Sequence, residues 1–160
     1  MIRINDMVRR IIQSGSILIR VEFSMEPLKW GPVYEMGIPD LDAQHRLLLS
    51  LVNEVVAAVS DREQIRLEPV LDQLVEYAKV HFAEEERRMA VVEFPDIKAH
   101  IREHHGFQER VTELYSRYLG GDSRVALELS AFLRAWLVAH IQGSDRHYVP
   151  YLQNPKASRP

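Results

Sequence analysis

Apolar residues recur every three or four positions along four segments of the chain, a spacing that places them on one face of an α-helix. The segments begin near Asp40 or Asp42 (either of which can cap a helix), near Pro69, at Ile97 and at Val125, and they end at Ser60-Asp61, Phe94-Pro95-Asp96, Gly120-Gly121 and between His140 and Gly143. No long segment alternates with the period of two that a half-buried strand shows, so no sheet is expected. Four amphipathic helices with short links predict an all-α, up-down-up-down four-helix bundle.

The residues before the first helix have a different pattern. Glu26–Pro39 is rich in proline, glycine and aromatic residues, and we expect it to form an irregular arm. Residues 1–24 are only weakly patterned. We therefore expect an N-terminal extension of unknown role over residues 1–24 and one bundle domain over residues 25–160. A natural start at Met25 is a further hypothesis.

Seven polar side chains fall on or beside the apolar faces of the expected helices. They are His45, His81, Glu85, His100, His104, His140 and Asp145. In this topology the first and third helices begin at the end where the second and fourth finish, so early residues of one pair lie beside late residues of the other. All seven side chains are therefore expected near one end of the bundle, facing inward. His105 and His147 lie off the apolar faces, and we expect them to be exposed.

Two of the spacings are those of metal ligands on one helix face. His81 and Glu85 are one helical turn apart, and so are His100 and His104. Burying such groups is costly unless something compensates them, and a metal ion does so for imidazole and carboxylate alike. The sequence therefore predicts a metal site, and the number of ligands favours two metal ions.

His140 and Asp145 do not have the spacing of a regular helix face. Five residues of α-helix span about 500°, which separates the two side chains by about 140°. They can share a site only if the helix ends or distorts between them, and Gly143 is the expected place for this.

Composition limits the chemistry that such a site can use. The chain has 160 residues, a formal net charge of −3 and no cysteine. Disulfides, thiolate zinc sites, iron–sulfur clusters and cysteine nucleophiles are therefore excluded. The charge does not favour nucleic acid, no apolar run approaches the roughly 20 residues of a membrane span, and the N-terminus lacks the unbroken apolar stretch of a secretory signal. We expect a cytoplasmic protein without nucleic-acid binding or membrane insertion.

The balance of ligands narrows the choice of metal and reaction. Imidazole and carboxylate suit iron, zinc, manganese or copper. The Glu-x-x-His pattern of bundle di-iron oxygenases is absent, because no glutamate lies three residues before a histidine. Neutral nitrogen ligands should stabilise ferrous iron, which favours reversible binding of oxygen over its activation.

Four groups of residues together resemble the bacterial hemerythrin family. They are Trp30…Tyr34-Glu35-Met36-Gly37-Ile38-Pro39 with Asp42-Ala43-Gln44-His45; His81-Phe82-x-x-Glu85-Glu86 with Met89; Phe94-Pro95 with His100-x-x-x-His104-x-x-Phe107; and Trp136-Leu137 with His140-Ile141-x-Gly143-x-Asp145. The resemblance extends from about Trp30 to Leu152. It implies a non-heme di-iron protein, not an enzyme, that binds O2 reversibly for storage, delivery or sensing.

The resemblance also implies individual roles. His100, His104 and His140 would bind one iron, His45 and His81 the other, and Glu85, Asp145 and an oxo or hydroxo group would bridge the two. O2 would bind at the open position of the two-histidine iron, in a pocket lined by Leu48, Phe82, Trp136, Leu137 and Ile141. Core packing alone would also explain these five apolar residues. Residues 1–24 have no counterpart in the usual family pattern.

Three other interpretations stay open. The same di-iron site could serve an enzyme that reduces peroxide or nitric oxide. The protein could deliver or report oxygen to an unidentified protein partner, with residues 1–24 as a docking element. The run His100-Ile101-Arg102-Glu103-His104 also fits the His-x-x-Glu-His motif of a zinc peptidase. That reading leaves the remaining five candidate ligands unexplained.

Overall fold

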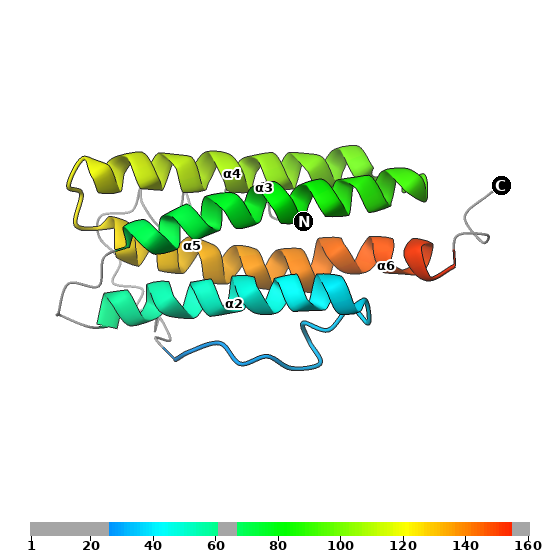
Figure 1. Ribbon diagram of the computed structural model, residues 1–160, viewed down its shortest axis with the longest axis horizontal. Coiled ribbons are helices and arrows are strands. Elements are labelled where there is room, and N and C mark those ends of the chain that lie inside the picture. Colours follow the sequence, from blue (N-terminus) through cyan, green and yellow to red (C-terminus); the bar gives the residue numbers. More distant parts are fainter. Residues whose placement is uncertain (1–25, 61–66, 155–160) are drawn as a thin grey trace, which may run out of the picture.

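The computed structural model describes residues 26–60 and 67–154, so the expectations for residues 1–25 lie outside the described residues. Its helices are α2 (Pro39–Ser60), α3 (Glu68–Val91), α4 (Ile97–Leu119), α5 (Val125–Ala139), the π-helix η1 (His140–Asp145) and α6 (Arg146–Gln153). Within these ranges there is no strand. Both α2 and α4 pack against α3 and α5, which gives the predicted four-helix bundle (Figure 1).

The ends of α3 and α4 follow their local sequence signals. Pro69 lies in the first turn of α3, where its missing N–H is not needed. At the other end of α3, the Phe94 N–H donates to the Met89 carbonyl and Glu93 takes a left-handed φ of 53°. This is a Schellman motif. Gly121, with φ 81°, has the same position after α4, so the predicted glycine stop is confirmed.

The start of α2 differs from the expectation, since the helix begins at Pro39 and not at an aspartate cap. Asp42 lies in the first turns, is buried, and uses its carboxylate differently. Its two oxygens accept hydrogen bonds from the backbone N–H groups of Met36 and Gly37, at 2.7 and 3.2 Å. Asp42 therefore ties the arm to the helix.

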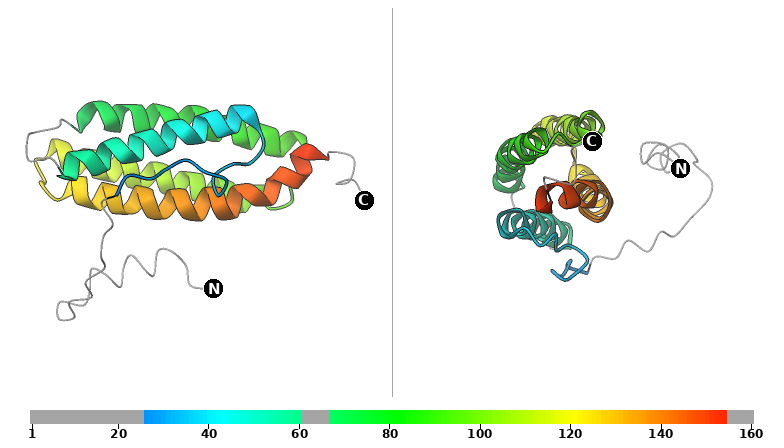
Figure 2. Two further views of the ribbon diagram at one scale, coloured as in Figure 1. Left: turned by 90° about the horizontal axis from the view of Figure 1, so that it is seen from below. Right: turned by 90° about the vertical axis from the view of Figure 1, so that its right-hand side faces the viewer.

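The arm before α2 runs along α2 and α5 and is held by side chains of the bundle (Figure 2). Asn53 of α2 pairs with both backbone groups of Leu28, at 2.7 and 2.9 Å. Arg146 of α6 donates to three arm carbonyls, those of Pro32, Val33 and Glu35, at 2.9–3.3 Å. The arm is irregular, as predicted, but its backbone is fastened to α2, α5 and α6.

The fourth helix of the bundle is longer than the sequence suggested, because α5, η1 and α6 follow one another as a continuous helical rod. The chain does not leave the helix before Gly143 but continues through η1 and α6 to Gln153. A Cβ at Gly143 would meet nothing within 4 Å and its φ is not positive, so this glycine does not stop the helix. Pro150 lies in α6, but its missing N–H would only have paired with the carbonyl of Arg146, the first residue of that helix.

Two apolar clusters fill the bundle. The larger includes Leu71, Leu74, Val111, Leu114, Leu129 and Leu133. The smaller consists of Met36, Leu41, Met89, Phe94 and Tyr148. The rod Val125–Gln153 is long and apolar enough to cross a membrane by length and composition, but many of its apolar residues belong to the larger cluster. Packing in the bundle accounts for its composition.

Candidate metal centre

The structure brings all seven predicted ligand residues together inside the bundle. None of the seven is more than 3% exposed. They come from all four helices of the bundle. His45 lies on α2, His81 and Glu85 on α3, His100 and His104 on α4, and His140 and Asp145 on η1, which continues α5. The predicted convergence of these residues is confirmed, while their role as ligands stays a prediction.

Glu85 lies between two sets of histidines. Its Oε1 is 3.5 Å from His81 Nε2 and 3.8 Å from His45 Nε2. Its Oε2 is 3.2 Å from His104 Nε2 and 3.7 Å from His100 Nε2. One carboxylate thus faces both sets, with a different oxygen turned to each.

Asp145 repeats this arrangement. Its Oδ2 is 3.5 Å from His45 Nε2, while its Oδ1 is 3.1 Å from His140 Nε2 and 3.4 Å from His100 Nε2. The two carboxylates therefore divide the imidazoles in the same way, into a pair (His45 and His81) and a group of three (His100, His104 and His140).

These distances fit ligands around metal ions. With metal–ligand bonds of about 2.0–2.2 Å, two ligands at right angles are roughly 3 Å apart. Glu85 with the three-histidine group, and Glu85 with the histidine pair, each offer ligand atoms within 4.8 Å of one another. The Nε2 atoms of His45 and His100 and both Asp145 oxygens find no hydrogen-bond partner among the described residues. Buried polar atoms seldom stay unpartnered without such a reason.

The π-helix solves the spacing problem of His140 and Asp145. In η1 the hydrogen bonds run from residue i to i+5, so residues five apart lie near one face. The expected distortion between these residues is confirmed. Its form, a wider helix with no break, was not foreseen.

Behind the ligand nitrogens lies a second layer of polar contacts that sequence reasoning missed. Glu86 lies 2.8 Å from His104 Nδ1, and Glu103 lies 2.9 Å from His140 Nδ1 and accepts the Ser144 hydroxyl. For His81 the partner is the amide oxygen of Gln44, at 2.6 Å. Such contacts fix the ring orientation, and carboxylate partners raise the basicity of the imidazole. The available signal was position, since Glu86 and Glu103 each adjoin a predicted ligand in sequence.

Tyr148 is a further residue that the sequence did not single out. It is fully buried, and its hydroxyl donates to Glu85 Oε1. Its place three residues after Asp145 puts it on the same side of the helical rod, which would have been the clue. The contact holds the central carboxylate in place.

Burial keeps the imidazoles of His81 and His140 neutral. It lowers the pKa of His81 to about 3 and that of His140 to about 4, although neighbouring carboxylates oppose the shift. A neutral imidazole offers a free lone pair to a metal at neutral pH. Burial, the Glu85 charge and the Glu103 charge raise the pKa of Asp145, whereas the surrounding histidines, His81 foremost, outweigh burial and hold the pKa of Glu85 low.

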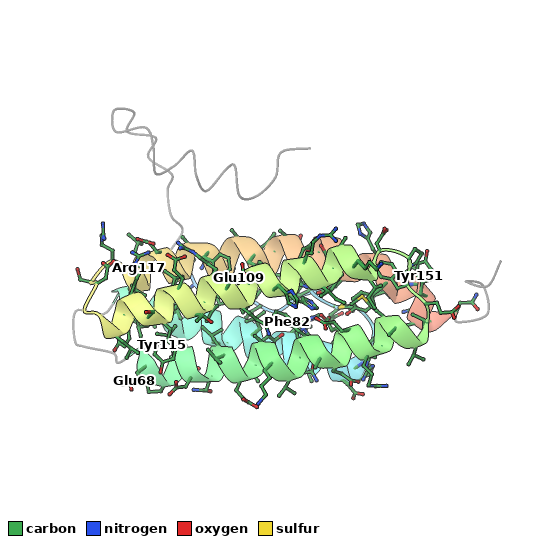
Figure 3. The ribbon with its side chains drawn as sticks, turned by 90° about the horizontal axis from the view of Figure 1, so that it is seen from above. Glu68, Phe82, Glu109, Tyr115, Arg117 and Tyr151 are labelled. Atoms are coloured by element: carbon green, nitrogen blue, oxygen red, sulfur yellow. The ribbon has the colours of Figure 1, made fainter. Side chains whose placement is uncertain are left out.

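The five predicted pocket residues are all buried in the larger apolar cluster: Leu48, Phe82, Trp136, Leu137 and Ile141. Phe82, labelled inside the bundle in Figure 3, stacks on His104 with ring centroids 3.9 Å apart. Trp136 stacks on His140 at 4.1 Å. These contacts exclude water from one side of the site. His105 and His147 are exposed, as expected.

Comparison with known proteins places the chain in a family. The sequence model described as "Hemerythrin HHE cation binding domain" matches residues 36–152. Bacteriohemerythrin of Stenotrophomonas maltophilia is 34% identical over 124 residues, which cover 78% of this chain and 80% of that protein. Bacteriohemerythrin of Methylococcus capsulatus is 33% identical over 113 residues, or 69% and 85% of the two chains.

A crystal structure of wild-type hemerythrin has the same fold, with a TM-score of 0.72 and 26% identity over 79% of this chain and 98% of that one. The match of residues 36–152 lies within the predicted bundle domain, and the boundary near residue 25 stays a prediction. By sequence, fold and the set of residues at its centre, this chain belongs to the hemerythrin family.

Proposed function

We propose that this protein binds two iron ions and uses them to bind O2 reversibly, for storage, delivery or sensing. The observation that supports this best is the geometry of Glu85 and Asp145, each of which turns one oxygen to the histidine pair and the other to the three-histidine group. This is the arrangement that two carboxylates need to bridge two metal ions. Iron bound here would supply reversible dioxygen binding by cycling between its ferrous and ferric states.

The chain's own residues would divide the work. His45 and His81 would hold one iron, His100, His104 and His140 the other, and Glu85 and Asp145 would bridge them together with an oxo or hydroxo group. Because it has fewer histidines, the His45–His81 half would leave a position for an external ligand. The apolar side chains of Leu48, Phe82, Trp136, Leu137 and Ile141 would keep water out and so slow oxidation of the iron.

The contacts of Glu103 argue against the zinc peptidase reading. A peptidase would need this glutamate as a general base beside a metal-bound water. Instead its carboxylate lies 2.9 Å from His140 Nδ1 and accepts a hydrogen bond from the Ser144 hydroxyl. These two contacts hold Glu103 on the Nδ1 side of a proposed ligand histidine. This contact explains the glutamate of the motif without peptide hydrolysis.

A visible absorption spectrum tests the proposal. Iron-loaded protein is reduced without oxygen, exposed to oxygen, and then flushed with inert gas. A charge-transfer band that appears with oxygen and disappears on flushing is the expected result, with about two irons per chain. A band that persists would favour a di-iron enzyme or a redox sensor. One zinc per chain and no band would overturn the proposal.

Three further parts of the proposal concern location, catalysis and partners. We propose that the protein works in the cytoplasm, does not catalyse a reaction, and exchanges oxygen with or reports it to a protein partner. Steady turnover of peroxide or nitric oxide with an electron donor would contradict the second of these.

A further inference from the structure

Tyr77 has a buried hydroxyl that the fold does not use. The residue is 6% exposed, and its phenol oxygen finds no hydrogen-bond partner among the described residues. Leaving such a group unpartnered in a core is costly, so it calls for an explanation. Of the eight buried side-chain atoms in this condition, six belong to four proposed metal ligands. The other two are the hydroxyls of Tyr77 and Ser130.

Only the tyrosine is shown in contact with a proposed ligand. Tyr77 lies one turn before His81 on α3, and the two rings stack with centroids 4.8 Å apart. The O–H of a tyrosine phenol is a hydrogen-bond donor. Tyr77 is therefore an unused hydrogen-bond donor beside the metal centre.

Its position favours one half of that centre. His81 belongs to the histidine pair, which has one protein ligand fewer than the three-histidine group. On the other half, His104 is covered by Phe82, which has no donor. Tyr148 also contacts a ligand histidine, His100, with ring centroids 5.5 Å apart, but its hydroxyl already donates to Glu85. Among the described residues, Tyr77 is thus the phenol beside a ligand histidine whose donor is unpartnered, and it lies on the half with fewer ligands.

A groove between α2 and α3 leads to the same residues. It encloses about 300 Å³ and is lined by Gln44, Leu47, Val80, Tyr77 and His81, among others. Leu47 and Val80 are half exposed, so the groove opens to solvent. Tyr77 and His81 therefore line a groove that small molecules can enter from solvent.

We propose that the Tyr77 hydroxyl donates a hydrogen bond to the external ligand of the two-histidine half, a small anion or a diatomic molecule that gains negative charge on binding. This inference rests on the proposed function, because it requires the metal pair. It adds a selective contact to a pocket that is otherwise apolar, since a donor favours ligands that carry negative charge.

Azide tests the proposal on the full-length, iron-loaded, oxidised protein. Tyr77→Phe removes only the hydroxyl, and Tyr34→Phe is the matched control because Tyr34 is also 6% exposed. Loss of one hydrogen bond to a charged ligand should weaken azide binding about tenfold in Tyr77→Phe and shift the infrared stretch of bound azide. Tyr34→Phe should behave like the unaltered protein in both measurements.

A second readout needs no metal. In the metal-free protein, Tyr77→Phe removes an unpartnered buried hydroxyl, so its thermal midpoint should stay the same or rise by a few degrees. A purely structural role for the hydroxyl would lower the midpoint, and that result would overturn the inference.

The remaining outcomes separate this inference from the proposed function. Azide affinity in Tyr77→Phe within about twofold of the unaltered protein overturns the inference alone, provided that both bind two irons. A visible phenolate-to-iron band that only Tyr77→Phe abolishes also overturns it, because Tyr77 would then be a ligand itself. Failure of the unaltered protein to bind two irons contradicts the proposed function as well.

Discussion

The two halves of the bundle place their charges in opposite ways. In the half near the α4–α5 turn the interior is apolar, with Leu71 and Leu129 fully buried. Its ion pairs lie outside, where Arg117 (labelled in Figure 3) donates to Asp122 and Glu128 at 2.7–2.8 Å. In the half that contains η1, Glu85 and Asp145 are buried among imidazoles.

This contrast indicates that the first half contributes to the stability of the fold, whereas the second half is suited to binding a ligand. Burial of apolar side chains stabilises the first half without help. Burial of ionisable groups destabilises the second half unless something pairs with them. Metal binding compensates this cost, so metal affinity and folding stability should be coupled in the second half and independent in the first.

The largest expected effect comes from removing a bridging carboxylate. Glu85→Ala or Asp145→Ala removes one of the two carboxylates that both histidine sets share, so iron content should fall well below about two per chain. His105→Ala and His147→Ala are the controls, because both residues are exposed. Iron analysis of the four variants measures the effect, and equal losses in all four would contradict the ligand assignment.

A cavity in the apolar half should affect stability alone. Leu129 is fully buried, and Leu129→Ala should lower the free energy of unfolding by about 2–5 kcal/mol while iron content stays unchanged. Leu127→Ala on the same helix is the control, since Leu127 is 51% exposed. Urea unfolding with iron analysis checks both parts. Loss of iron from Leu129→Ala would show that the halves are not independent.

The smallest expected effect is the pH dependence of the metal-free protein. The pKa values of His81 and His140 are about 3 and 4 in the folded state, below the unfolded value of about 6.5. Between these values the unfolded chain binds more protons than the folded chain, so stability should fall as pH is lowered from about 6.5 toward 4. The raised pKa of Asp145 opposes this trend, but one group does not offset two.

Urea midpoints of the metal-free protein at about pH 7, 6 and 5 measure this slope. His140→Phe removes one of the titrating rings and should flatten the curve. A midpoint that does not change with pH would mean that these histidines are not buried in the absence of metal.

Much of this arrangement could be predicted, because the periodicity and spacing of residues determine which side chains share a helix face. The apolar stripes predicted the bundle, and the topology predicted that His45 would meet His81 across two helices. The ends of helices were less certain, because a glycine such as Gly143 stops a helix only where the backbone needs a positive φ. The contacts of Glu103 and Tyr148 could not be predicted, because each depends on the three-dimensional position of a group far away in sequence.

The π-helix η1 has a consequence for how this chain can change during evolution. Its wider turn contains one residue more than an α-helical turn, and that residue turns Asp145 toward the centre. A regular α-helix over the same six residues would leave His140 and Asp145 about 140° apart, whereas deleting one residue would place the carboxylate four residues after His140, on the same face of an α-helix. Point substitutions at Gln142 or Gly143 change no such alignment. The length of this segment and its π-helical form can therefore change only together.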